Sequence, residues 1–172
     1  FRGMLAHAPP VAVDDALPPG LHIEVDRLQI QQVLLNLLKN AWDASRGLPA
    51  ERQRIDIRLE TAAGSLHIRV RDYGSGLDET ARAQLFESFF TTKADGLGLG
   101  LSICRSIAEA HGGRLAVATS DTATDTAPDA PPHDPANASA DTALGAVGAT
   151  FILSLPLSPS AHGAASIEAP SA

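Results

Sequence analysis

Two asparagines four residues apart, Asn36 and Asn40, are the first residues whose types and spacing could do chemistry. On a helix they share one face, with Gln32 one turn before them and Asp43 about one turn after. An amide oxygen is a suitable hard ligand for Mg²⁺ beside phosphate oxygens, whereas an exposed helix face more often carries Glu, Lys or Arg. The pair therefore indicates a magnesium and phosphate site, and a solvated polar helix face is the alternative.

A second candidate is the turn from Asp72 to Gly76, which follows a predicted strand. Its glycines, Gly74 and Gly76, permit a close backbone approach by a ligand. A dinucleotide-binding loop would need a third glycine near position 79, where Glu79 stands, and a complete strand-helix-strand unit, so that class is excluded. A plain Asp-Gly turn remains open.

Three alternating glycines, Gly96, Gly98 and Gly100, precede a predicted helix. Backbone amides at a helix start can bind an anion, and the neighbouring Thr92 and Lys93 favour phosphate. The sequence contains no Gly-x-x-x-x-Gly-Lys-Ser/Thr pattern, so this loop is not a P-loop, and the motifs of eukaryotic-type protein kinases are absent. A flexible hinge or a helix C-cap is the other interpretation.

The bulk composition limits the function classes. A chain of 172 residues that is 44% hydrophobic is long enough for one packed domain. Its net charge of -7 argues against a nucleic-acid surface. The single cysteine, Cys104, excludes an internal disulfide framework and fits a reducing compartment. No apolar run reaches membrane-spanning length, so we expect no direct membrane contact and a cytoplasmic domain.

Hydrophobic periodicity predicts the elements that must position these residues. Asp26 is a candidate N-cap for a helix over 26–45, and Gly47 and Pro49 stop it. Two alternating runs joined through Ala63-Gly64 predict a hairpin. The full set of expected elements is a strand over 21–25, the helix over 26–45, strands over 54–60 and 66–72, helices over 78–84 and 99–111, and strands over 114–117 and 149–155.

The remaining segments are poor in large apolar residues. We expect 1–20 to be a linker from a preceding dimerisation domain, and 21–157 to form the folded domain. Residues 119–148 consist mainly of Ala, Asp, Thr and Pro, which predicts a disordered insertion between the last two strands. A disordered tail is expected over 158–172.

Taken together, four segments resemble the N, G1, F and G2 boxes of sensor histidine kinases. These segments are 32–41, 72–76, 86–93 and 96–102. The family belongs to the ATPase superfamily that also contains gyrase B, Hsp90 and MutL, and the resemblance covers about 21–155 without the insertion. It implies an α+β fold, a two-layer α/β sandwich known as the Bergerat fold, in which a mixed sheet of about five strands packs on three helices.

The resemblance also implies a role for each site residue. Asn40 would bind Mg²⁺, and Asn36 would lie near the attacked phosphate, where gyrase-like relatives carry a glutamate base. Asp72 would accept a hydrogen bond from the adenine amine, and Lys93 would touch the γ-phosphate, so Asn36 and Lys93 are the implied catalytic residues. The implied nucleotide-binding residues are Asn36, Asn40, Asp43, Asp72, Gly74, Gly76, Thr92, Lys93, Gly96, Gly98, Leu99, Gly100 and Leu101.

One position departs from the family pattern. Many members carry a lysine three residues after the second asparagine, and this chain has Asp43 there. Neutralising the phosphates would then fall to Lys93, Arg46 or another group.

The implied function is transfer of the γ-phosphoryl of Mg-ATP to a histidine on a dimerisation domain of the same parent protein, which then serves a response regulator. His7 is a poor acceptor, because Pro9 and Pro10 follow it closely and cannot continue a helix. Two alternatives remain open. One is a nucleotide-binding regulatory module without phosphotransfer, and the other is a gyrase- or Hsp90-like ATPase.

Overall fold

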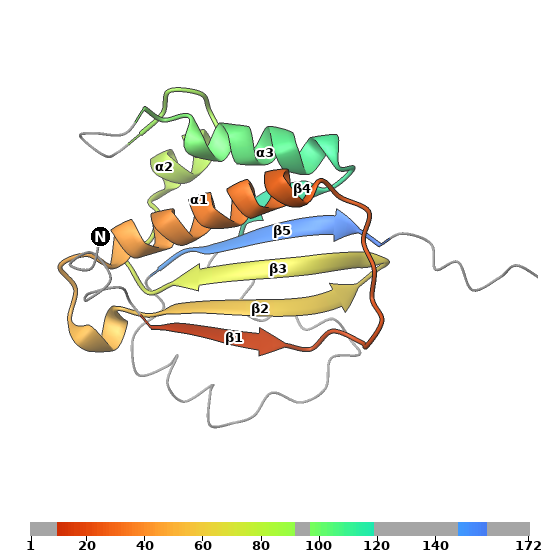
Figure 1. The fold of residues 1–172 in the computed structure, drawn as a ribbon. Coiled ribbons are helices and arrows are strands. Elements are labelled where there is room, and N and C mark those ends of the chain that lie inside the picture. Colours follow the sequence, from red (N-terminus) through yellow and green to blue (C-terminus); the bar gives the residue numbers. More distant parts are fainter. Residues whose placement is uncertain (1–9, 92–96, 119–147, 158–172) are drawn as a thin grey trace, which may run out of the picture.

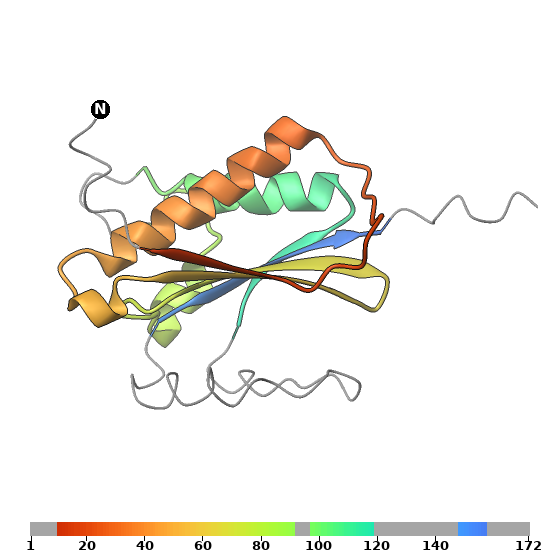
Figure 2. The same ribbon diagram turned by 60° about the horizontal axis from the view of Figure 1, so that its bottom comes forward.

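The computed structural model describes residues 10–91, 97–118 and 148–157. Their strands form one five-stranded sheet in the order β1-β2-β3-β5-β4. The first two strands are parallel and the other neighbours are antiparallel, so the sheet is mixed. Figures 1 and 2 show α1 and α3 lying over the same face of this sheet. The architecture is the two-layer α/β sandwich that the family resemblance implies.

Helix α1 (Arg27–Ser45) is the longest element, and its ends match the prediction. The carboxylate of Asp26 accepts hydrogen bonds from the backbone N–H groups of Leu28 and Gln29, at 2.8 and 3.2 Å, and so caps the first turn. Val33 and Leu37 are fully buried against the sheet. The helix therefore turns one apolar stripe toward the sheet, and its polar side chains lie outside that stripe.

Strands β2 (Ile55–Ala62) and β3 (Ser65–Asp72) form the predicted hairpin. Its two turn residues, Ala63 and Gly64, both have positive φ, at 49° and 75°, as a two-residue hairpin turn of type I′ requires. Burial alternates along β3 and along β5 (Thr150–Pro156). The inward residues of these strands, with α1 and α3, make the core.

The prediction of a strand over 21–25 was wrong. Leu21, Ile23 and Val25 do pack against the core, which explains their alternation with exposed neighbours, but they pair with none of the strands that the structure describes. The strand is instead β1 (Val11–Asp15), which pairs in parallel with β2. Residues 11–15 therefore belong to the sheet, and the predicted linker over 1–20 is corrected there.

The two shorter predicted helices are present. Helix α2 (Glu79–Gln84) is capped by Asp78, whose carboxylate accepts from the N–H of Ala81 at 2.6 Å. Helix α3 (Gly100–Ala110) is followed by the strand β4 (Arg114–Val117). A 3₁₀ turn, η2 (Ala50–Arg52), connects α1 to β2.

His111 joins the two long helices. Its Nδ1 lies 2.8 Å from the carbonyl oxygen of Ile107, and its Nε2 lies 3.0 Å from the backbone nitrogen of Asp26. A carbonyl only accepts and an N–H only donates, so the imidazole carries its proton on Nδ1. The C-terminal end of α3 is thereby fixed to the N-cap of α1.

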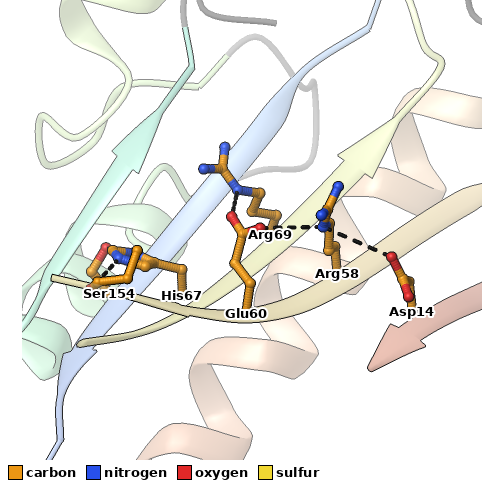
Figure 3. A network of polar contacts seen from close by, with 7 residues as sticks. Asp14, Arg58, Glu60, His67, Arg69 and Ser154 are labelled. Carbon is orange, nitrogen blue, oxygen red and sulfur yellow. Dashed lines mark hydrogen bonds and ion pairs between the residues drawn. The ribbon is translucent and has the colours of Figure 1, made fainter. Parts of the chain in front are cut away.

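The sheet face away from α1 and α3 carries a polar network (Figure 3). Arg58 lies 3.8 Å from Asp14 and 3.2 Å from Glu60, and Arg69 lies 2.6 Å from Glu60. His67 and Ser154 contact each other farther along this face, at 2.8 Å. Asp14, Arg58, Glu60 and Arg69 thus form one connected ionic group on this face.

The expected disordered insertion, apart from Gly148, and the expected tail lie outside the described residues, as do residues 1–9 of the expected linker. Within the described ranges, no helix is both long and apolar enough to cross a membrane.

Candidate functional site

The two asparagines of α1 face the start of α3. The Nδ2 of Asn40 donates to the Oδ1 of Asn36 at 3.5 Å. A Cβ on Gly100, the first residue of α3, would lie 2.7 Å from that same Oδ1. Asn36 is half-buried against another helix, and a Cβ at position 100 would fit only if the Asn36 amide moved.

The segment before α3 is hydrogen-bonded to the 86–93 segment. The N–H of Phe89 donates to the carbonyl oxygen of Gly98 at 3.0 Å. Gly98 has a φ of 67°, and a Cβ there would lie 2.4 Å from the carbonyl carbon of Phe89. Leu99 occupies the N-cap position of α3, and its carbonyl accepts from the hydroxyl of Ser102 at 3.0 Å. This close packing brings Gly98, Leu99 and Gly100 to the N-terminal end of α3, where Leu101 follows.

Asp72 is a buried carboxylate at the end of β3. Its side chain is only 3% exposed, and its Oδ1 accepts from the N–H groups of Gly74 and Ala149, at 2.8 and 3.3 Å. Burial raises the pKa of Asp72, while these two hydrogen bonds and the charge of Arg71 oppose that shift. A buried charge held by two amides suggests a group kept for recognition.

The Asp72 turn is fixed against α1. A Cβ on Gly74 would lie 2.8 Å from both the Cβ and the carbonyl oxygen of Ala44. Ala44 lies eight residues after Asn36, so α1 spaces the turn from the start of α3 by roughly 12 Å. Helix α1 thus connects the two parts of the candidate site. The start of α3, with Gly98 and Gly100, packs near Asn36, and the Asp72 turn packs near Ala44. Gly76 follows in that turn with a φ of 75°.

Asp43 forms ion pairs with Lys39 of α1 and with Arg46, the residue that follows the helix. Lys39 lies 3.3 Å from one of its oxygens and Arg46 lies 3.8 Å from the other. These two ion pairs partly offset the negative charge of Asp43, and both involve exposed cations.

The sequence analysis missed a group of residues behind the Asp72 turn. Arg52 donates from Nε to the carbonyl of Tyr73 at 3.0 Å and from a terminal nitrogen to that of Gly74 at 2.8 Å. The Tyr73 hydroxyl donates to Asp56 at 2.6 Å and accepts from Arg54 at 2.5 Å. Burial first, and then the bond to Asp56, raise the pKa of Tyr73 to about 12. No sequence motif predicts such contacts with backbone carbonyls.

Three of the predicted site residues, Thr92, Lys93 and Gly96, lie outside the described residues. Their positions in the site stay predictions. In the ranges that the structure covers, no group of three or more His, Cys, Asp or Glu side chains is placed to hold a metal ion.

The fold and the four motifs together define a class of ATP-binding domain. The chain belongs to the family of histidine kinase-, DNA gyrase B- and HSP90-like ATPases, whose sequence profile matches residues 25–159. The resemblance drawn from the motifs is thus confirmed, and ATP is the ligand that an ATPase domain implies.

Individual relatives narrow the comparison to sensor histidine kinases. The sensor protein TdiS of Thauera aromatica is 44% identical over 101 residues, which are 58% of this chain and 18% of TdiS. The nucleotide-free catalytic domain of the histidine kinase ThkA superposes with a TM-score of 0.63 at 27% identity, over 91% of this chain and 84% of that domain. Full-length ShkA in complex with AMPPNP gives a TM-score of 0.60 at 25% identity, over 87% of this chain and 26% of ShkA. This chain thus corresponds to a small part of its full-length relatives.

Proposed function

We propose that this domain binds Mg-ATP along α1 and transfers its γ-phosphoryl group to a histidine on a dimerisation domain of the same parent protein. The observation that carries the proposal is the alignment of two sites on one helix. The buried Asp72 turn packs on Ala44, and the start of α3 packs on Asn36. One helix thus holds a base-reading carboxylate and an anion-binding helix end at a fixed separation.

The adenine end is supported by the geometry of Asp72. Its Oδ1 is occupied by two backbone amides, and among the described residues no hydrogen bond is made by its Oδ2. That oxygen is available to accept from the exocyclic amine of adenine, whereas guanine presents a carbonyl oxygen at the same place. Gly74 and Gly76 would line the base and ribose.

The phosphate end is supported by the N-terminus of α3. This helix spans 11 residues, and its first N–H groups have no partner within the helix, so its dipole favours an anion there. The amides from Gly98 to Leu101 would contact the phosphates, and Thr92, Lys93 and Gly96 would complete the contact. Lys93 would lie at the γ-phosphate.

The residues present also fit Mg²⁺. The amide oxygens of Asn36 and Asn40 are hard ligands, and they lie on the helix face turned toward the start of α3. Asn40 would hold the ion, which supplies charge neutralisation to the phosphates. Asn36 would lie near the reacting phosphorus.

The chemistry favours transfer over hydrolysis. An amide such as that of Asn36 cannot take a proton from water, so the site lacks the base that gyrase-like relatives carry at this position. An imidazole nitrogen needs no such base, because its lone pair forms the new N–P bond directly while the bond to the bridging oxygen breaks and ADP leaves. Positioning and charge stabilisation then supply the catalysis.

Asp43 favours a second candidate function, a nucleotide-binding regulatory module without phosphotransfer. It places a carboxylate where many relatives have a lysine, and ion pairs to Lys39 and Arg46 reduce but do not reverse its charge. Such a module would bind Mg-ATP and label no histidine.

The proposed partners are the acceptor dimerisation domain and, through it, a response regulator, and the proposed compartment is the cytoplasm. Calorimetric titration of the chain with Mg-ATP and Mg-GTP tests the nucleotide site. We expect ATP to bind about 10- to 150-fold more tightly, since a hydrogen bond to a charged group is lost with GTP. Equal affinities would contradict the assignment of Asp72.

A further inference from the structure

A single peptide unit links Arg52 to Asp72. The Nε of Arg52 donates to the carbonyl oxygen of Tyr73, and the N–H of the same peptide unit, which belongs to Gly74, donates to Oδ1 of Asp72 at 2.8 Å. A terminal nitrogen of Arg52 also donates to the carbonyl of Gly74. One guanidinium therefore fixes two successive peptide planes of the turn.

The side chain of Tyr73, the residue between Asp72 and Gly74, also has several contacts. The ring of Tyr73 is buried, with the guanidinium carbons of Arg54 and Arg71 at 4.3 and 4.9 Å from its centroid. Its hydroxyl is bonded to Asp56 and Arg54. These contacts fix the Tyr73 side chain, while Arg52 fixes the backbone of the turn.

We propose that Arg52 is a positioning residue for recognition of the nucleotide base. It presets the turn so that the carboxylate of Asp72 faces the adenine amine. The inference rests on the proposed function, because it assigns the base to this turn.

Two physical arguments support a role beyond holding the fold. The turn contains Gly74 and Gly76, whose backbones have many accessible conformations, so a clamp that selects one of them reduces the ordering cost of ligand binding. In addition, a cation on the Tyr73 carbonyl polarises that peptide unit, which strengthens the hydrogen bond from the Gly74 N–H to Asp72. Both effects act on base recognition and neither acts on the phosphates.

The test compares Arg52→Ala, Arg52→Lys and the control Arg58→Ala in the full chain. Arg58 is an arginine of the neighbouring strand, and it pairs with Asp14 and Glu60 on the sheet face opposite α1 and α3. Calorimetry gives the Mg-ATP and Mg-GTP affinities, and transfer to an added dimerisation domain gives kcat and KM. Melting temperatures without nucleotide report the fold.

For Arg52→Ala we expect ATP affinity to fall about tenfold and GTP affinity to change little, so that base selectivity narrows. KM for ATP should rise with kcat within about twofold, because binding of the ground state and the transition state weakens equally. Arg52→Lys keeps the charge but not the two-pronged geometry, so it should recover only part of the loss. Arg58→Ala should match the parent in affinity and selectivity.

Two results would overturn the inference. One is an Arg52→Ala protein that retains the parent's ATP affinity and selectivity. The other is equal loss of ATP and GTP together with a lowered melting temperature, which would make Arg52 a structural residue. Failure of the proposed function is distinguishable from both, because it is read on the parent chain, which would then bind ATP and GTP equally or label no histidine on the added dimerisation domain.

Discussion

The amide oxygen of Asn36 lies so close to Gly100 that a Cβ at position 100 would come within 2.7 Å of it. The contact joins the middle of α1 to the first residue of α3, although 64 positions separate the two residues in the sequence. The three atoms that would lie nearest to such a Cβ all belong to the Asn36 side chain, which can move. A methyl group there should therefore disturb the site more than the fold.

Gly100→Ala should slow phosphotransfer by about tenfold or more while the melting temperature stays within a few degrees of the parent, because alanine favours the helix and only Asn36 must shift. Gly113→Ala is the contrasting variant. Its Cβ would lie 2.2 Å from the backbone oxygen of Ser154, so it should lose stability instead.

A double variant makes the Gly100 prediction sharper. In an Asn36→Ala background the added methyl group has no amide to displace, so Gly100→Ala should cause little further loss of transfer. Fully additive losses in the double variant would show that Gly100 acts independently of Asn36.

Asp72→Asn should weaken Mg-ATP binding about 10- to 150-fold and shift preference toward GTP, since an amide nitrogen at Oδ2 donates where the carboxylate accepted. The other oxygen can still accept from Gly74 and Ala149, so the turn should persist. Calorimetry with both nucleotides measures the change. An unaltered ATP preference would separate Asp72 from the base.

The same variant has a pH signature. Because burial raises the pKa of Asp72 in the folded chain, its contribution to stability is fully present below the unfolded pKa, about 3.9, and is lost as pH rises through the folded value. At neutral pH the nucleotide-free Asp72→Asn protein should therefore melt no lower than the parent. Any excess in the melting temperature of the variant over the parent should shrink as pH falls toward about 4. A difference that grows on acidification would contradict the sign of the pKa shift.

Asn40→Ala should weaken Mg-ATP binding and remove activity while leaving the fold intact, because a half-buried polar side chain contributes little to the apolar core. Its nucleotide-free melting temperature should stay within several degrees, since about 1 kcal/mol moves a domain of this size by roughly 2 to 8 °C. Loss of the folded state would instead make Asn40 structural.

His111→Ala should destabilise the domain by about 1 to 3 kcal/mol, because the backbone N–H of Asp26 loses its acceptor and the Ile107 carbonyl loses a donor. Nucleotide affinity should change little. Gln can both donate and accept, so His111→Gln is the matched control and should recover part of the loss. Urea unfolding measures both, and an Ala variant as stable as the parent would show that the bridge contributes nothing.

Local signals in the sequence predicted most of the fold. The Asp26 cap, the Ala63-Gly64 turn and the alternation of β3 each depend on near neighbours, and the structure confirms them. Strand β1 was missed because its pairing with residues 55–59 is parallel and distant in sequence, which leaves no turn signal. Residues 21–25 show that alternating burial does not require a strand partner.

The candidate site was likewise predicted only in part from the sequence. Asparagine spacing and glycine patterns indicated Asn36, Asn40, Asp72 and Gly100 as candidates, because their residue types carry the chemistry. The sequence did not reveal that Gly100 packs on Asn36 or that Arg52 donates hydrogen bonds to the Tyr73 and Gly74 carbonyls. Backbone acceptors have no residue type, so such contacts are visible only in three dimensions.

The most direct test of the account follows the γ-phosphoryl group of labelled Mg-ATP. The chain alone should take up essentially no label, and addition of the parent protein's dimerisation domain should produce acid-labile, base-stable label on one histidine of that domain. Asn36→Ala or Lys93→Ala should slow this transfer more than it weakens ATP binding. Label on this chain by itself, for instance at His7, or steady ATP hydrolysis without a labelled histidine, would contradict the proposed phosphotransfer.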